Sequence, residues 1–293
     1  MKSTDFLALQ RVTQAARDLG HYNLAKLLDA ARASLVQQTV RASGLPLTDA
    51  ALLAELSSLE QTLADASLAP DLMAAIRNTH AAIAQNGMAL LTDAPPVFVC
   101  RHCGQVELHQ APEMCSHCGA GGLTFEEIIA AHYLVPEAPE RALTHLRAMP
   151  DTLDQLLAGL TEAQTARKIP GAEGEWSLRE ATGHLRDANR LLADRVDLIL
   201  TCAEPELKAQ ATWEAAASAV QETSAAIAGQ FRHERAAVVQ RLAPLTPAEW
   251  GRAGWHGEFG RVTVLGQATY FAKHEHWHLA QMTRLRRELR GTE

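Results

Sequence analysis

Four cysteines within nineteen residues constrain this chain more than any other feature of its sequence. They form the pattern Cys100-x2-Cys103-x11-Cys115-x2-Cys118, and a glycine follows each pair. A two-residue gap lets both sulfurs of a pair reach one ion, and the glycine lets backbone N–H groups approach and donate to the thiolates. Four thiolates at this spacing favour tetrahedral Zn²⁺ or a mononuclear iron. The sequence therefore predicts a closed four-cysteine metal site.

Length and composition predict more than one packed unit around this site. The chain has 293 residues, of which 47% are hydrophobic and 21% charged, so it can bury real cores and fits neither a disordered nor a membrane protein. A domain typically has roughly 100–200 residues. The formal net charge of −7 offers no positive field for nucleic acid or anionic lipid. We therefore expect neither nucleic acid nor a membrane as a partner.

The N-terminal residues and the apolar runs predict a cytoplasmic protein. Polar and charged residues (Gln10, Arg11) come too early for the apolar core of a signal peptide, and no run approaches the ~18 apolar residues of a membrane span. In a reducing compartment, paired Cys-x-x-Cys units are metal ligands or redox thiols rather than structural disulfides.

Helical periodicity and its interruptions divide the chain into three parts. We expect three or four helices in the first part, with breaks at Gly20, at residues 44–46 and at Pro70. The last part predicts four helices, the number that a bundle needs, and Ser177 and Glu180 form a capping box at the start of one of them. Those helices are expected near 140–160, 177–201, 211–242 and 262–290. The predicted domains are a helical region (1–95), a loop-rich four-cysteine module (96–130) and the bundle (138–293).

Three histidines in the last part form a second candidate metal site. On one helix His274 and His278 lie four residues apart and share a face, whereas His276 points away. If a helix pair brings His184 opposite them, the result is a three-His site with open positions for water or substrate.

Other residues around this trio have weaker predicted roles. Glu180 and Asp187 lie one turn to either side of His184, so either carboxylate is a candidate to orient that imidazole or to act as a catalytic base, or is simply solvated. Gln281 is a candidate hydrogen-bond partner of a ligand. Isolated histidines such as His256 are interpreted as surface groups or satisfied core groups.

The four-cysteine segment resembles the rubredoxin-like tail of rubrerythrins over about thirty residues. The resemblance rests on Val99-Cys-Arg-His-Cys-Gly, on Ala111-Pro-Glu-Met-Cys-Ser-His-Cys-Gly and on Phe125-Glu-Glu-Ile. It implies a small β module of the rubredoxin or zinc-ribbon type. In that pattern a proline follows the first cysteine of each pair, and here Arg101 and Ser116 occupy those positions. Zinc and iron, and a structural or an electron-transfer role, therefore stay open for this site.

Residues 140 to 290 resemble the DinB-like metal-dependent superfamily of four-helix bundles. The matching pieces are Glu175-Trp-Ser with His184-Leu, the stretch Gly257-Glu-Phe-Gly-Arg-Val-Thr-Val, and His274-Glu-x-x-His278-x-x-Gln281. The resemblance implies a mainly α fold and assigns the metal ligands to His184, His274 and His278. The acid after the first histidine of the pair is commonly Asp in that family, and here it is Glu275.

These observations predict a bacterial-type metalloprotein with a divalent ion (Zn, Ni or Fe) at the three-His site and Zn or Fe at the four-cysteine site. We expect an enzyme that acts on a small molecule, either by transfer to a low-molecular-weight thiol or by hydrolysis; a homodimer is compatible with this interpretation. Two alternatives stay open: a redox protein that passes electrons between two irons, and a non-catalytic binding or regulatory module.

Overall fold

The computed structural model describes residues 3–44, 48–65, 68–169, 176–208 and 219–291. The chain separates into two compact units, Met1–Leu52 and Leu53–Glu293. The described residues are mainly helical, with two small sheets, which confirms the mainly α fold class. None of the described helices combines the length and the apolar character needed to cross a bilayer.

The first unit contains helices α1 (Ser3–Asp18) and α2 (Tyr22–Ser43), which pack against each other. Gly20 ends α1 with a positive φ of 81°, a conformation that glycine adopts without a Cβ penalty. An ion pair between Arg17 and Asp29 joins the two helices. The break predicted at Gly20 is therefore confirmed.

The second unit begins with α3 (Asp49–Asp65) and α4 (Pro70–Asn86). Pro70 occupies the first turn of α4, where its missing N–H has no intrahelical partner to lose. Gly87 ends the helix in the left-handed region and donates its N–H to the Ile83 carbonyl.

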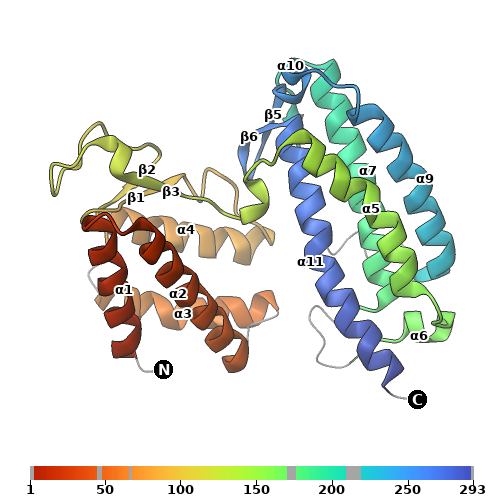
Figure 1. Cartoon of the computed structure of the whole chain (residues 1–293), viewed down its shortest axis with the longest axis horizontal. Coiled ribbons are helices and arrows are strands. Elements are labelled where there is room, and N and C mark those ends of the chain that lie inside the picture. The colour runs from red at the N-terminus through yellow and green to blue at the C-terminus, as the bar shows by residue number, and fades with distance from the viewer. Residues whose placement is uncertain (1–2, 45–47, 66–67, 170–175, 209–218, 292–293) are drawn as a thin grey trace. The chain divides into compact units, whose positions relative to one another are not determined.

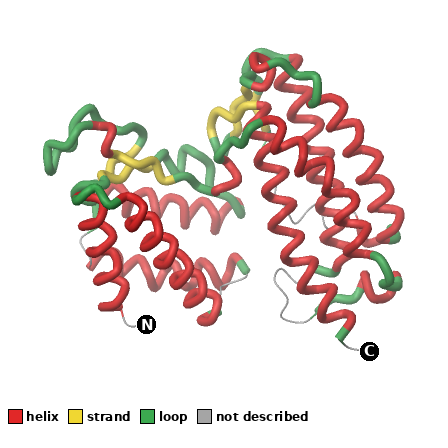
Figure 2. The backbone as a smooth tube through the Cα atoms, in the orientation of Figure 1, coloured by secondary structure: helices red, strands yellow, loops and turns green. Residues whose placement is uncertain are grey.

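The four-cysteine module is built on an antiparallel sheet of order β2-β1-β3. Its strands are β1 (Val97–Cys100), β2 (Val106–Leu108) and β3 (Phe125–Ile128), with a 3₁₀ turn, η1 (Gly122–Thr124), before β3. A second 3₁₀ turn, η2 (His132–Leu134), leads to the bundle. The remaining residues of the module are loops and turns (Figure 2), in line with their glycine content.

Four long helices form the bundle, and they run alongside one another in Figure 1. They are α5 (Pro139–Leu157), α7 (Leu178–Thr201), α9 (Ser224–Leu242) and α11 (Val264–Arg290). Each packs against two others: α7 and α5 both contact α9 and α11. The short helices α6 (Glu162–Ala166) and α10 (Pro247–Trp250) lie in the connections. Because α7 and α11 are neighbours, their inward faces meet.

Buried apolar side chains from all four helices fill the interior of the bundle. Fully buried examples are Leu146, Leu153, Leu185, Leu192, Phe231, Leu242, Phe271 and Met282. Burial of one such side chain contributes about 1.5–3 kcal/mol relative to exposure. Capping fixes where α7 begins: the Ser177 hydroxyl accepts from the Glu180 N–H, and the Glu180 carboxylate accepts from the Ser177 N–H, which confirms the predicted capping box.

One helix boundary differs from the prediction. The helix expected over 211–242 begins at Ser224, where the Thr223 hydroxyl accepts the Ala226 N–H. A short 3₁₀ turn, η4 (Ala219–Gln221), precedes it, and the 211–218 part of the predicted helix lies outside the described residues.

A second sheet of order β4-β5-β6 closes one end of the bundle, where Figure 1 shows β5 and β6 beside the start of α11. Strands β5 (Ala253–His256) and β6 (Gly260–Thr263) form an antiparallel hairpin, and β4 (Glu206–Leu207) pairs with β5 in parallel. The stretch that the sequence places at the entry to the last helix is therefore a hairpin that leads directly into α11.

The close packing of α7 against η4 predicts that Gly183→Ala destabilises the bundle. An added Cβ at position 183 would lie 2.2 Å from the Ala219 Cβ, so one of the two backbones must move. We expect the free energy of unfolding to fall by about 1–3 kcal/mol, the usual cost of overpacking. Urea unfolding of the two proteins measures this. Gly229→Ala on α9, where the added Cβ meets nothing within 4 Å, serves as the control and should not lower stability.

Candidate metal sites

Two knuckles of nearly identical backbone geometry present the four cysteines. In the first, the Cys100 N–H donates to the Gln105 carbonyl and the Gly104 N–H to the Cys100 carbonyl; in the second, Cys115 and Gly119 make the equivalent bonds to Ala120 and Cys115. Gly104 and Gly119 both have positive φ, 83° and 74°. This conformation explains the glycine after each Cys pair.

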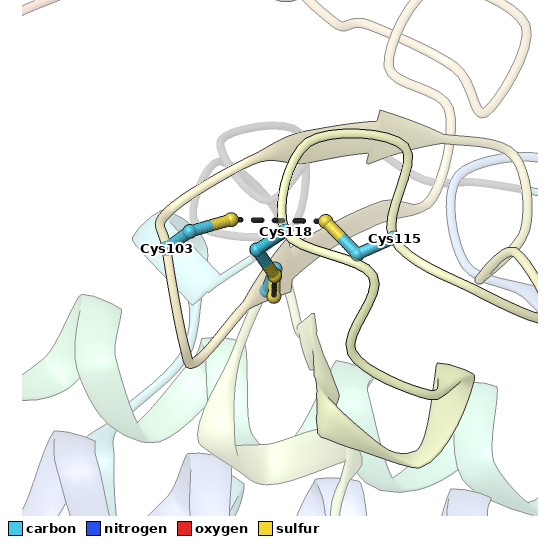
Figure 3. Close-up of side chains that lie close together, drawn as sticks. Cys103, Cys115 and Cys118 are labelled. Atoms are coloured by element: carbon cyan, nitrogen blue, oxygen red, sulfur yellow. Dashed lines mark hydrogen bonds between the residues drawn. The ribbon is translucent and has the colours of Figure 1, made fainter.

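The four sulfurs converge from the two knuckles, as Figure 3 shows for Cys103, Cys115 and Cys118. The Sγ atoms of Cys103 and Cys115 are 3.7 Å apart, and those of Cys100 and Cys118 are 3.8 Å apart. Four Zn–S bonds at tetrahedral angles require S···S separations of about 3.8 Å, whereas a disulfide requires about 2.05 Å. The side chains are free thiols in a geometry able to hold one metal ion.

Backbone N–H groups donate to the sulfurs and favour the thiolate form at one of the cysteines. Burial raises the pKa of the Cys100 thiol, but the N–H groups of Cys103 and His102 donate to its sulfur, and the balance lowers the pKa to about 6. The Gln105 N–H donates to the Cys103 sulfur and the Ala120 N–H to the Cys118 sulfur, but burial and the neighbouring cysteines outweigh these bonds, raising the pKa of Cys103 to about 12 and that of Cys118 above its usual value. This pattern of donors matches the one predicted from the two Cys-x-x-Cys-Gly units.

Three histidines meet between the neighbouring helices α7 and α11. The Nε2 atom of His274 lies 3.3 Å from Nε2 of His184 and 3.1 Å from Nε2 of His278. Three Zn–N bonds at tetrahedral angles require N···N separations of about 3.3–3.4 Å. The predicted pairing of His184 with the His274–His278 face is therefore present, and the three side chains are able to hold a metal ion.

The hydrogen bonds of the three imidazoles also fit a cation at their centre. His278 Nδ1 lies 2.9 Å from Gln281 Oε1, so Nδ1 carries the proton and Nε2 presents its lone pair. The Nδ1 atoms of His184 and His274 are buried and have no hydrogen-bond partner among the described residues. Three neutral imidazoles cannot satisfy both short Nε2···Nε2 contacts by hydrogen bonding, because His274 Nε2 has at most one proton. A metal ion accepts all three lone pairs at once.

Aromatic rings enclose the histidine cluster. The Trp176 ring packs edge-on against His184, with centroids 4.9 Å apart, and stacks on His278 at 5.9 Å. Tyr270 stacks on His274 at 5.9 Å. Two sides of the cluster are therefore covered by aromatic rings. Glu175, which belongs to the same sequence motif as Trp176, lies outside the described residues.

Burial keeps the imidazoles neutral, as metal ligands must be. Burial, with the charges of His278 and His274, lowers the pKa of His184 to about 2. Burial and the charge of His278 lower the pKa of His274 to about 3. Both side chains are therefore unprotonated in the folded protein at neutral pH.

The lowered pKa values predict acid sensitivity of the metal-depleted protein. The unfolded chain binds protons on these two imidazoles below pH 6.5, whereas the folded state stays neutral down to about pH 3. Because the unfolded state binds more protons in this range, stability falls as the pH drops from 6.5, by up to about 1.4 kcal/mol per pH unit and per histidine. Urea unfolding at pH 7.5 and pH 5.0 checks this. His184→Gln should reduce the slope; an unchanged slope contradicts the assignment.

The two carboxylates predicted as orienting groups or bases are engaged elsewhere. Glu180 accepts from Ser177 in the capping box and forms an ion pair with Lys168 at 3.1 Å. Asp187 accepts from Arg186 at 3.0 Å and from Arg190 at 3.3 Å. Both carboxylates therefore take part in helix capping or in ion pairs. His276 lies apart from the cluster, with its Nε2 atom 3.0 Å from His145 Nδ1 on α5.

A buried ion pair behind the histidines was not predicted from the sequence. Arg235 on α9 and Glu275 on α11 are each 1% exposed and form a bidentate ion pair. Arg235 Nε also donates to the Asn189 side chain on α7 at 2.7 Å. The pair thereby links three helices next to His274. The one signal in the sequence was Glu275, the acid that follows His274. Its partner Arg235 lies 40 residues away in the chain.

Comparisons with known proteins find relatives of the C-terminal half of the chain. Residues 145–282 match the model of the DinB superfamily. YfiT from Bacillus subtilis, described as a probable metal-dependent hydrolase with an unusual four-helix bundle topology, is similar in structure, with 21% sequence identity and a TM-score of 0.47. The match covers 51% of this chain and 86% of YfiT. No curated protein matches the sequence at a significant level.

Proposed function

Because the C-terminal half of this chain is a DinB-like domain, we propose that the protein is a metal-dependent enzyme that acts on a small molecule at the three-His site. The observation that carries the proposal is the convergence of three Nε2 atoms, from His184 on α7 and from His274 and His278 on α11, within 3.1–3.3 Å of one another along the chain of contacts. In this proposal the four-cysteine site holds a structural ion, since closed four-thiolate sites are predominantly structural.

Each histidine of the cluster has a defined part in this function. A divalent ion bound there supplies a Lewis acid that lowers the pKa of a thiol or a water molecule placed beside it. His184, His274 and His278 hold the ion, and three protein ligands leave at least one position for a substrate. Gln281 fixes the His278 tautomer, and Trp176 and Tyr270 exclude water.

The surroundings of the site favour a thiol over water as the nucleophile. Thiols ionise outright on metal binding, whereas hydrolysis usually gains from a neighbouring base. Glu180 and Asp187 are occupied by a capping box and by arginines. We therefore propose transfer to a low-molecular-weight thiol as the reaction; Asp187 and Glu180 stay the bases to test if water proves to be the nucleophile.

The experiment compares thiol conjugation with hydrolysis in one preparation loaded with Zn²⁺, Ni²⁺ or Fe²⁺. Monobromobimane with 2-mercaptoethanol reports thiol transfer, and p-nitrophenyl acetate reports hydrolysis. We expect metal-dependent thiol conjugation that falls at least 100-fold in His278→Ala and is unchanged in Cys202→Ser, an exposed cysteine. Ester hydrolysis without thiol turnover contradicts the thiol proposal, and turnover that survives His278→Ala contradicts the site.

The colour of the purified protein tests whether the four-cysteine site is structural. Zinc in four thiolates is colourless, whereas ferric iron in the same site is red. We expect a colourless four-cysteine site, and a red protein that bleaches on reduction would instead support the redox alternative. The cytoplasmic location, the homodimer and the division at residues 95, 130 and 138 remain predictions.

A further inference from the structure

Three arginines are buried in the bundle, and one of them differs from the other two. Arg186 is paired with Asp187 and Glu222, and Arg235 with Glu275. Arg195 on α7 is 7% exposed, yet it forms no ion pair with any described residue. A buried charge without a counter-charge is costly. Among the described residues, the guanidinium of Arg195 therefore has no paired anion, unlike the other two.

The hydrogen bonds of Arg195 leave the Nε atom of its guanidinium without a partner among the described residues. Nη1 donates to the Gln267 side chain at 3.3 Å, and Nη2 donates to the Lys208 carbonyl at 2.7 Å. Nε is buried and has no hydrogen-bond partner in the part of the chain that the structure describes. The Nε and Nη2 atoms form the edge with which arginine binds a carboxylate through two parallel hydrogen bonds.

His256 on β5 faces this edge with a donor of its own. The backbone N–H groups of Glu258 and Phe259 donate to His256 Nδ1 at 3.2 and 3.3 Å, so the single proton of the neutral ring is on Nε2. His256 Nε2 lies 3.0 Å from Arg195 Nη2, so two hydrogen-bond donors face each other at this contact. An oxygen atom of an anion placed beside both would accept from each.

The two helices that carry the three histidines also carry Arg195 and its partner Gln267. Arg195 follows His184 by eleven residues on α7, and Gln267 precedes His274 by seven on α11, spacings of nearly whole helical turns that keep each pair on one face. Along α11 the separation is about 10 Å. Tyr270, which stacks on His274, is in electrostatic contact with Arg195. Along α7 the separation is about 16 Å, and the long Arg195 side chain covers part of that span.

We propose that Arg195 and His256 bind the carboxylate of the small molecule whose other end reacts at the three-His site. This inference rests on the proposed function and adds the substrate class, a small carboxylic acid. Glu258 influences Arg195 electrostatically but makes no ion pair with it, and burial raises the pKa of Glu258. Glu258 is therefore the described acid whose carboxylate acts on Arg195 without a direct ion pair.

Side-chain ¹⁵N NMR of the metal-loaded protein tests the binding step directly. The protein is titrated with propionate, with inorganic phosphate and with neutral propionamide. We expect propionate to shift the Arg195 Nε–H and His256 Nε2–H resonances in a saturable manner, and propionamide to have no effect. Arg186 and Arg235 provide internal controls, because their carboxylate partners are already in place. No shift at Arg195, or saturation by phosphate alone, overturns the carboxylate assignment.

Two variants locate the site. Arg195→Gln should weaken propionate binding by about ten- to a hundredfold, the loss expected for a charged hydrogen-bond donor. His256→Leu should weaken it by up to about tenfold and serves as the second test should Arg195→Gln fail to fold. Unchanged affinity in a folded variant overturns the proposal.

A comparison of two thiol substrates tests whether the carboxylate site acts in the proposed reaction. Arg195→Gln should raise KM for 3-mercaptopropionate at least tenfold and leave KM for 2-mercaptoethanol unchanged; equal effects on both thiols contradict a carboxylate site. The propionate titration is repeated with His278→Ala. Propionate binding that survives in this variant with no metal lost overturns the three-His proposal alone. Wild-type protein that holds two metal equivalents but shows no propionate shift at Arg195 overturns the anion site alone.

Discussion

Glu275→Gln is expected to lower the free energy of unfolding by about 3–5 kcal/mol, one of the largest effects of any single change in the bundle. The substitution leaves the Arg235 guanidinium buried and without a counter-charge, although its bond to Asn189 remains. Chemical unfolding of metal-depleted protein at pH 7.5 measures the loss without a contribution from a metal ion at the neighbouring histidines.

Arg232→Gln provides the matched control, because Arg232 lies on α9, the helix that also carries Arg235. Arg232 is 47% exposed and is paired with Asp151 and Asp154, which are more exposed still. Exposed pairs contribute about 0–1 kcal/mol, so this change should have little effect. Equal losses in Arg232→Gln and Glu275→Gln would show that the buried pair has no special role.

Cys115→Ser is expected to unfold the four-cysteine module while the bundle stays folded. Cys115 is 3% exposed, and its sulfur lies 3.7 Å from that of Cys103. Structural Zn²⁺ contributes about 10–16 kcal/mol of apparent binding free energy in small modules, and a serine hydroxyl does not replace a thiolate ligand. Amide hydrogen exchange should show lost protection in β1 and β3, and unchanged protection in α7 and α11.

Cys202→Ser is the control for this result, because Cys202 is an exposed thiol outside the module. It should leave both hydrogen exchange and metal content unchanged. If Cys115→Ser keeps the protection of β1 and β3, the ion is not what holds the module together.

Local signals predicted several helix ends, although the start of α9 differs from the prediction. The capping box of Ser177 and Glu180 fixed the start of α7, and Pro70 and the glycines at positions 20 and 44 fell at helix ends. These signals act within one or two turns of chain, so they can be read without knowing the fold. The four-residue strands of the hairpin carry no such signal, and we did not predict them.

The two candidate metal sites also differ in how far they could be predicted from local sequence. The geometry of the four cysteines is local, since a knuckle sets each pair. The pairing of His184 with His274 and His278 depends on which helices are neighbours, and its prediction needed a family resemblance as well as spacing. Arg195 and His256 meet across 61 residues, and nothing in their own stretches of sequence indicates it.

Quantitative metal analysis tests the central claim most directly. The wild-type protein, reconstituted and freed of loosely bound ions, should contain two metal equivalents per chain. His184→Ala and His278→Ala should each contain one, with the four-cysteine ion retained, and Cys115→Ser should lose only the other ion. If His184→Ala and His278→Ala fold normally and still contain two equivalents, the three-His site is not a metal site and the proposed function is contradicted.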